Sequence, residues 1–192
     1  MSTPLSGPTR VRGRPVEINR EHLAMVALRL FEARGFDNVS AAEIAATAGV
    51  SRRSLFRYYP TKADLVWDRF DESLAVLEEA LTTAAGEPLA AATEALGVVA
   101  DQTVVVSQTR TRLIIIAAHD DLFSYGSPRL QRQATILRTY LLDRGLEALQ
   151  ARVAGSALTL ASFSGYLHWA TSSAQEHPSV VVREALSTLT LF

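Results

Sequence analysis

The chain has 192 residues, 48% of them apolar and none of them cysteine, so it can bury a sizeable core but excludes disulfide frameworks and thiolate metal sites. Its net charge of −1 hides an asymmetry: residues 1–62 carry ten Lys or Arg against five acidic residues, and residues 63–192 carry nine against fifteen. A basic head on an acidic body indicates that the head meets a polyanion.

The N-terminal arm and the first helix are marked by composition and spacing. Residues 1–16 are rich in Pro, Gly, Ser and Thr, which predicts a flexible basic arm. A helix is predicted over 20–34, because its apolar residues recur at helical spacing on one face. Gly35 follows directly, and we expect it to end this helix in a left-handed conformation.

Two short helices should follow, joined by a turn that contains glycine. Ser40 and Glu43 have the capping-box spacing that opens the first of them. Gly49 and Val50 make the turn, and Ser51 caps the next helix. One longer helix followed by two short ones describes a helix-turn-helix, although any small three-helix bundle has the same spacing.

The charge pattern of the third helix favours DNA binding over a plain bundle. Arg52, Arg53 and Arg57 share one helical face with Phe56, and no acidic residue occurs in 51–61. Arginine can bind guanine O6 and N7 through two hydrogen bonds, and an apolar ring can meet a thymine methyl. Since solvated faces normally alternate in sign, this face is predicted to enter the major groove.

The stretch from about 20 to 70, a quarter of the chain, resembles the DNA-binding domain of the TetR family of regulators. The resemblance rests on these motifs: Leu30-Phe31, Gly35-Phe36, Ile44-Ala45, Ala48-Gly49-Val50-Ser51, the segment 54–62, and Asp64-Leu65. It implies that bases or nearby phosphates are contacted by Arg52, Arg53, Ser54 and Arg57. It implies that phosphates are held by Ser40, Ser51, Tyr58 and Lys62.

Two positions depart from the family pattern. Phe56 stands where the family usually has tyrosine, so a phenolic phosphate contact is lost. Arg53 stands where the family often has a small residue, so the helix can sit differently or read an extra base. The operator therefore cannot be copied from relatives.

A short segment of the arm is a second candidate for DNA binding. Arg12-Gly13-Arg14-Pro15 resembles the core of an AT-hook, which lays arginines in a narrow minor groove. Flexible basic arms beside a helix-turn-helix do this in other proteins. A disordered basic tail has the same composition, and the sequence leaves both readings open.

The remaining chain is predicted to be helical throughout, which gives an all-α protein. We expect three parts: the arm 1–16, a helix-turn-helix domain 17–63, and a helical domain for effector binding and dimerisation, 64–192. In that domain a long helix should continue from near Lys62 to about residue 85. Later helices are expected to hold Leu96 with Val106, to span 109–118, to start at Ser127-Pro128, and to cover 157–176 and 179–191.

Small residues near the C-terminus indicate close helix packing. Those on the penultimate predicted helix are Ala157, Ala161, Ser164 and Gly165, with His168 on the same side. The family resemblance implies that they form a two-fold four-helix interface with Val182, Ala185, Leu186 and Leu189. The same residues could instead pack within one chain. A protein that binds a two-fold symmetric operator needs two DNA-binding heads, which favours the homodimer.

The family resemblance also implies an effector cavity inside the helical body. The stretch 55–71 is similar to regulators that accompany mycofactocin clusters, which implies a long acyl-CoA type of ligand. Core aromatic residues show the same helical spacing, so some of the candidates would be core residues that contact no ligand. The candidate lining residues are Trp67, Phe70, Arg110, Arg112, His119, Phe123, Tyr125, Tyr140, Phe163 and Tyr166.

Enzymatic and membrane functions find little support in the sequence. It has four histidines and lacks the His-Glu-x-x-His, Gly-x-Ser-x-Gly and Gly-rich phosphate-loop motifs. Consecutive residues such as His119 and Asp120 point about 100° apart on a helix, so we expect no metal and no cofactor. No apolar run approaches the roughly 18 residues that span a bilayer, and no signal peptide is evident.

The sequence thus predicts a cytoplasmic DNA-binding transcription regulator that is not an enzyme. Its expected partners are a double-stranded DNA operator, a second copy of the chain and a small-molecule effector. We expect a repressor that a small apolar ligand releases from DNA. An activator or a ligand-independent regulator is the alternative, and a helical enzyme is a remote one.

Overall fold

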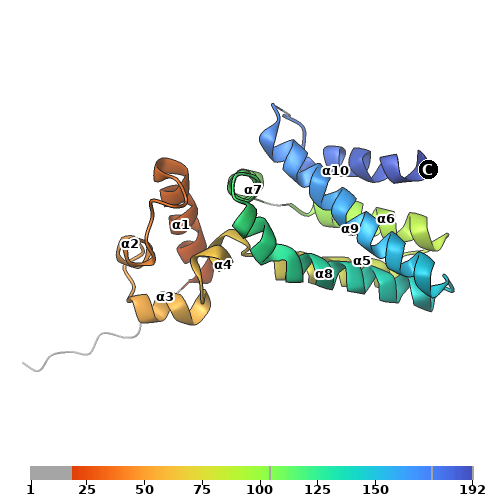
Figure 1. The fold of residues 1–192 in the computed structure, drawn as a ribbon, viewed down its shortest axis with the longest axis horizontal. Coiled ribbons are helices and arrows are strands. Elements are labelled where there is room, and N and C mark those ends of the chain that lie inside the picture. The colour runs from red at the N-terminus through yellow and green to blue at the C-terminus, as the bar shows by residue number, and fades with distance from the viewer. Residues whose placement is uncertain (1–18, 104, 174, 192) are drawn as a thin grey trace, which may run out of the picture.

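A computed structural model of the chain describes residues 19–103, 105–173 and 175–191, and all regular structure in these ranges is helical (Figure 1). The predicted all-α class is confirmed. The predicted arm, with Arg12 and Arg14, lies outside the described residues. The elements are α1 (Arg20–Arg34), α2 (Ala41–Thr47), α3 (Arg52–Tyr58), α4 (Lys62–Val66), α5 (Phe70–Thr83), α6 (Pro88–Asp101), α7 (Val106–Ala117), α8 (Asp120–Asp143), α9 (Ala148–Thr171), α10 (Pro178–Ser187) and a 3₁₀ turn, η1 (Thr188–Leu191).

Helices α1 to α3 form the head of the molecule, and local capping defines their ends. The side chain of Asn19 accepts hydrogen bonds from two N–H groups of the first turn of α1. Ser40 and Glu43 form the predicted capping box at the start of α2, and Ser51 caps α3. Gly35 ends α1 at φ 82°, ψ 148°, so its φ is positive as predicted but its ψ is extended rather than left-handed helical.

The long helix predicted after the head is broken in two. Helix α4 ends at Val66, Arg69 adopts a left-handed conformation with φ 71°, and α5 starts at Phe70. The break, residues 67–69, lets two adjacent residues both turn inward. Trp67 donates its indole N–H to the Leu122 carbonyl, and the carboxylate of Asp68 lies between the head and the body. On a continuous helix these neighbours would point about 100° apart.

Helix α8 starts earlier than predicted and passes through a proline. It begins at Asp120, whose acidic first turn suits the positive end of the helix dipole. The predicted start at Ser127-Pro128 is wrong, because Pro128 lies inside the helix. A proline removes one backbone donor. The indole of Trp67 packs against Gly126 and bonds to the Leu122 carbonyl, so it contacts the part of α8 that precedes the proline.

Other helix boundaries also differ from the predicted ones. Val106 starts α7 instead of sharing a helix with Leu96, since α6 ends at Asp101. The penultimate helix α9 begins nearer to α8 than predicted, because Gly145 turns the chain at φ 92° directly after α8. It ends at Thr171 rather than at residue 176.

Helices α5 to α10 form the body, in which the long helices α8 and α9 pack against each other and α10 packs against α9 (Figure 1). One apolar core runs from the head into the body and includes Phe31, Leu55, Trp67, Leu113 and Phe163. A second core fills the far end of the body around Leu77, Leu96, Leu137, Leu158 and Leu186. Head and body are therefore joined by buried apolar contact as well as by the chain.

The small residues assigned to a dimer interface are in part used inside one chain. A Cβ added to Gly165 would lie 2.9 Å from Cα of Val182 and 3.0 Å from Cβ of Ala185. Val182 and Leu186 are 0% and 1% exposed. Gly165 thus serves the packing of α9 against α10, which is the alternative that the sequence left open.

None of the described helices is by itself both long and apolar enough to cross a membrane. Helices α6 and α7 reach that length and composition only as a pair, which is bent by 110° at its break.

Candidate DNA-binding surface and effector cavity

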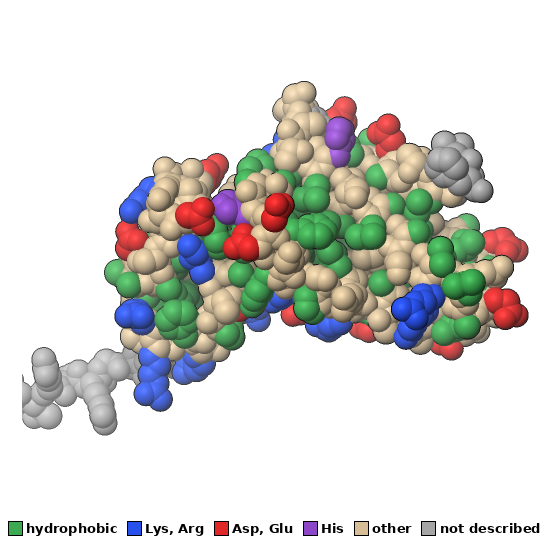
Figure 2. Space-filling view, viewed as in Figure 1, with side chains coloured by type: hydrophobic (Ala, Val, Ile, Leu, Met, Phe, Trp, Pro, Cys, Tyr) green, Lys and Arg blue, Asp and Glu red, His purple; other side chains and the backbone are tan. Residues whose placement is uncertain are grey.

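Helix α3 presents its arginines outward and its apolar residues inward. Leu55 and Tyr59 are each 1% exposed and anchor the helix in the core of the head. Arg52, Arg53 and Arg57 are exposed, and neither of the first two forms an ion pair with another described residue. Figure 2 shows Lys and Arg side chains gathered at the end of the molecule where α3 lies. The predicted reading face is therefore accessible to a large polyanion.

The aromatic residues of α3 sit on both sides of this face. Phe56 is 38% exposed, so its ring is available to an apolar partner. Tyr58 is half-buried and accepts a hydrogen bond of 3.2 Å from Nη2 of Arg57, whose guanidinium stacks 4.9 Å from the ring centroid. Arg57 is thus oriented by its neighbour before any DNA is bound.

The hydroxyls predicted to hold phosphates act as helix caps. Oγ of Ser51 accepts from the N–H of Ser54 at 3.1 Å, and the two hydroxyls lie 2.9 Å apart. Ser40 and Glu43 bond each other in the capping box. These hydroxyls lie at helix N-termini, where backbone N–H groups favour anions, and their contact with phosphate remains a prediction.

Lys62 is engaged inside the protein. Its Nζ donates to the carbonyls of Phe36 (2.7 Å) and Val39 (3.2 Å) and lies 4.0 Å from the centroid of the Phe36 ring. An ammonium group has three donors, so one remains for a phosphate oxygen. The lysine that the family resemblance assigns to DNA thus also holds the segment between α1 and α2.

A charge pair fixes α1 to α2. Arg34 donates to Oε1 of Glu43 at 2.7 Å, and the Ser40 N–H donates to Oε2 at 2.8 Å. The hydrogen bonds from the Ser40 backbone, the Arg34 guanidinium and the Ser40 hydroxyl lower the pKa of Glu43 from 4.5 to about 2. Glu43 therefore stays ionised in any buffer near neutrality.

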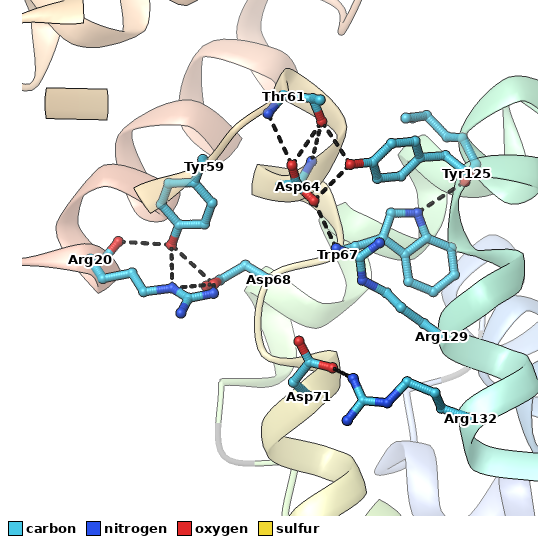
Figure 3. A network of polar contacts seen from close by, with 11 residues as sticks. Arg20, Tyr59, Thr61, Asp64, Trp67, Asp68, Asp71, Tyr125, Arg129 and Arg132 are labelled. Carbon is cyan, nitrogen blue, oxygen red and sulfur yellow. Dashed lines mark hydrogen bonds and ion pairs between the residues drawn. The ribbon is translucent and has the colours of Figure 1, made fainter. Parts of the chain in front are cut away.

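Asp68, in the break between α4 and α5, joins the head to the body. Its Oδ1 accepts from the Tyr59 hydroxyl at 3.0 Å and from Nε of Arg20 at 3.2 Å (Figure 3). Its Oδ2 lies 3.5 Å from Nη2 of Arg112 on α7. Burial and the adjacent Asp68 carboxylate raise the pKa of Tyr59 well above its ordinary value, so the phenol keeps its proton and donates.

A second polar cluster joins α4 to α8. Oδ1 of Asp64 accepts from the Tyr125 hydroxyl (2.8 Å) and from Arg129 (2.7 Å), as Figure 3 shows. Burial raises the pKa of Asp64, but the hydrogen bonds from Tyr125, Arg129 and Thr61 outweigh it and hold the pKa below its ordinary value. Tyr125, predicted to contact an effector, is instead part of the junction.

The body contains a cavity of about 330 Å³ beside this junction. Five of the ten predicted effector contacts line it: Trp67, Phe70, Arg112, Phe163 and Tyr166. The sequence interpretation missed most of the wall because it considered aromatic and charged residues only. Missed residues include Asp68, Val76, Leu96, Val99, Leu113, Ile116, Gln133 and Ser162. Inward positions on α5 to α7, read from helical spacing, could have indicated the apolar ones.

The other five predicted contacts lie outside the cavity. Arg110 stacks over Trp169 at 4.2 Å, and Tyr140 packs against the second core beside Arg144. Phe123 is 39% exposed and touches Phe163 from its far side, with ring centroids 5.9 Å apart. Two lie at the junction with the head: Tyr125, and His119, which is 3.5 Å from Asp37. Helical spacing marks these side chains as packed but does not reveal which of them borders a void.

The described residues hold no group of three His, Asp or Glu side chains that could bind a metal ion.

Known proteins share the head of this chain most closely. The model of the bacterial regulatory proteins of the tetR family matches residues 25–67. The mycofactocin biosynthesis transcriptional regulator MftR of Mycobacterium tuberculosis is 44% identical over 66 residues, 34% of this chain and 33% of that protein. The HTH-type transcriptional regulator AcrR of Shigella flexneri is 35% identical over 101 residues, 50% of this chain and 47% of that protein. The matches thus span a third to a half of these relatives.

Solved structures share the fold over most of the chain. FadR of Thermus thermophilus, a TetR family transcriptional repressor in complex with lauroyl-CoA, superposes with a TM-score of 0.62 at 23% identity, covering 90% of this chain and 93% of that one. NalD of Pseudomonas aeruginosa, the secondary repressor of the MexAB-OprM multidrug efflux pump, gives a TM-score of 0.64 at 18% identity, covering 90% and 94%. At these identities the likeness shows the fold alone: a helix-turn-helix head followed by a helical domain.

Proposed function

We propose that this chain is a member of the TetR family of bacterial regulators and acts as a homodimeric repressor that a small, largely apolar ligand releases from its operator. One observation carries the proposal. Trp67 and Phe70 line the cavity, while Asp68, between them in the chain, binds Tyr59 of the head. The same short segment therefore touches both the ligand space and the DNA-reading unit. The family consists of regulators rather than enzymes, so no catalytic role is proposed.

DNA reading is supported by the accessible arginines of α3. Arg52 and Arg53 are exposed at the N-terminal end of this helix, the end that recognition helices insert into the major groove. Arg57 is held by Tyr58 on the next turn. We propose that the first two read bases, and that Ser40, Ser51, Ser54, Tyr58 and Lys62 fix the head on phosphates. Arg12 and Arg14 are proposed to add contacts in the minor groove.

Dimerisation is supported by an apolar stripe on the outer face of α9. Leu149, Val153 and Leu160 are 74%, 59% and 53% exposed and follow one another at helical spacing. The small residues Ala157 and Ser164 lie between and beyond them on the same stripe. An exposed apolar surface of this kind marks an interaction site, and a two-fold axis would pair it with itself.

A ligand is supported by the size and chemistry of the cavity. Its volume of about 330 Å³ lies in the range of small-molecule sites, about 300–1,000 Å³. Eleven of the twenty-one residues that line it are aliphatic or aromatic, and ten are polar or charged, among them Arg69, Glu72 and Arg112. The fold is shared with a repressor in complex with lauroyl-CoA, which supports an apolar ligand for this chain as well.

The operator can be found by selection from a pool of random DNA duplexes with the full chain. We expect an inverted repeat, because a two-fold dimer presents two heads about one helical turn, or a multiple of it, apart. On this operator Arg52→Ala and Arg53→Ala should each cost about 1–3 kcal/mol and relax base preference at one position. Arg29→Ala, an exposed arginine of α1, is the matched control.

Two results would contradict the proposal. If no sequence is enriched from the pool, the chain does not bind a specific operator. An equal effect of the α3 and α1 variants on every sequence would show binding by charge alone.

A further inference from the structure

We infer that the cavity takes an apolar molecule ending in a single carboxylate, and that this carboxylate binds Arg112 in competition with Asp68. The inference rests on the proposed function, because it names the class of the ligand that the cavity would hold. It departs from the acyl-CoA that sequence similarity implies.

Arg112 is a buried cation with few partners. Its side chain is 9% exposed and lines the cavity. Its Nε is buried without a hydrogen-bond partner among the described residues. Its one ion pair with another described residue joins Nη2 to Oδ2 of Asp68 at 3.5 Å, beyond the 2.7–2.9 Å of a strong charge-assisted bond. Buried polar groups are normally satisfied, so this guanidinium is set up to receive a further acceptor.

A carboxylate is the acceptor that fits best. The guanidinium has five donors in one plane, and a carboxylate can accept two of them in parallel. Neutral hydroxyl or ketone groups accept one at a time and leave the positive charge with Asp68, at 3.5 Å, as its counter-ion. Burial lowers the pKa of Arg112, but an arginine remains charged at neutral pH, so the site keeps its demand for an anion.

The remaining wall sets the size and polarity of the molecule. At about 30 Å³ for each water-sized group, 330 Å³ holds about eleven groups. Decanoate, a straight chain of ten carbons that include the carboxylate carbon, is about that size. Gln133 is the other buried polar residue of the wall that reaches across helices, and its Nε2 donates to Oγ of Ser162 at 3.3 Å. The nucleotide and phosphates of coenzyme A would lie outside this space.

Binding of the carboxylate would change the link between head and body. Oδ1 of Asp68 is held by Tyr59 and Arg20 of the head, whereas Oδ2 lies 3.5 Å from Arg112 of the body. A ligand that occupies Arg112 leaves Asp68 bonded to the head alone. The charged contact between the break and α7 is then replaced by a contact between the ligand and α7, which gives ligand binding a direct effect on the head.

The test is calorimetric titration of the full chain with decanoate, decanol and decanoyl-CoA. Wild-type protein should bind decanoate about 10- to 100-fold more tightly than decanol, the usual worth of hydrogen bonds to a charged group. It should bind decanoyl-CoA more weakly than decanoate. Arg112→Gln should abolish the preference for decanoate, and Arg112→Lys should retain part of it because the charge stays but the planar fork is lost.

Two further variants separate the inference from a general loss of structure. Arg110→Gln lies on the same helix, outside the cavity, and should keep the preference. Asp68→Asn removes the competing charge and should tighten decanoate about tenfold while leaving decanol unchanged, a gain that misfolding cannot produce.

Equal affinity of the wild type for decanoate and decanol would overturn the inference, as would a preference that survives Arg112→Gln. If decanol nevertheless releases operator DNA, the proposed repressor function stands with a different ligand class. If decanoate binds as predicted and operator affinity is unchanged, the inference on Arg112 stands and the proposed function fails.

Discussion

Gly126 is the point of closest approach between α8 and Trp67, and one added methyl group there tests how the junction is held. A Cβ on Gly126 would lie 1.9 Å from Cζ2 of Trp67 and 2.3 Å from Cε2. The indole cannot move aside freely, because its N–H donates to the Leu122 carbonyl at 3.0 Å and its ring stacks on Phe163 with centroids 5.7 Å apart. Gly126→Ala must therefore displace a ring that is fixed on both sides.

The expected cost follows from three contributions. Overpacking costs about 1–3 kcal/mol, and loss of the buried indole hydrogen bond costs about 1–3 kcal/mol more. Alanine returns about 1 kcal/mol through its higher helix propensity. The net destabilisation is about 1–5 kcal/mol, which at roughly 2–4 °C per kcal/mol lowers Tm by about 2–20 °C.

Scanning calorimetry of Gly126→Ala against Ser124→Ala measures this effect. Ser124 is exposed on the same helix, so its variant gains helix propensity without a clash and should melt at or slightly above the wild-type temperature. An unchanged or raised Tm for Gly126→Ala would show that the Trp67 indole is not held in place between Leu122 and Phe163.

Three more outcomes are expected. Lys62→Met should lower the free energy of unfolding in urea by about 1–2 kcal/mol, because the carbonyls of Phe36 and Val39 lose a charged donor. An unchanged urea midpoint would show that Lys62 does not stabilise the fold. Glu43→Gln should destabilise the protein at neutral pH but not in acid: the folded-state pKa of about 2 lies below the ordinary 4.5, so the contribution of Glu43 is complete above 4.5 and is lost as pH falls toward 2. Parallel pH profiles of the unfolding free energy for wild type and variant would contradict this contribution of Glu43. Leu160→Glu should halve the mass seen by light scattering, whereas Gly165→Leu should lower Tm, since Gly165 packs against Val182 inside the chain; a full-mass Leu160→Glu places the dimer face elsewhere.

The head could be predicted almost residue by residue because its signals are local. Capping by Ser40 and Ser51 depends on residues three positions away, and the helix over 20–34 ends at a glycine with positive φ. The arginine face of α3 follows from helical spacing alone. For such elements the nearest neighbours in the sequence are also the nearest neighbours in space.

The junction could not be predicted because its partners are distant in the chain. The break at 67–69 depends on Asp68 meeting Arg20 and Arg112, which come from α1 and α7. Helix α8 runs through Pro128 where the sequence pattern predicts a start, since contact with Trp67 outweighs the local signal. Half of the predicted effector contacts lie outside the cavity for the same reason: spacing shows that a side chain is buried, not what it faces.

The central claim is that filling the cavity weakens operator binding, and both events can be followed in one titration. Trp67 lines the cavity, so its fluorescence in a Trp169→Phe background reports occupancy, while the anisotropy of a labelled operator reports DNA binding. Decanoate or decanol, whichever binds, should change both signals over the same concentration range, and operator should weaken ligand binding by the factor by which ligand weakens operator binding. Saturation of the Trp67 signal with no change in anisotropy would contradict the account.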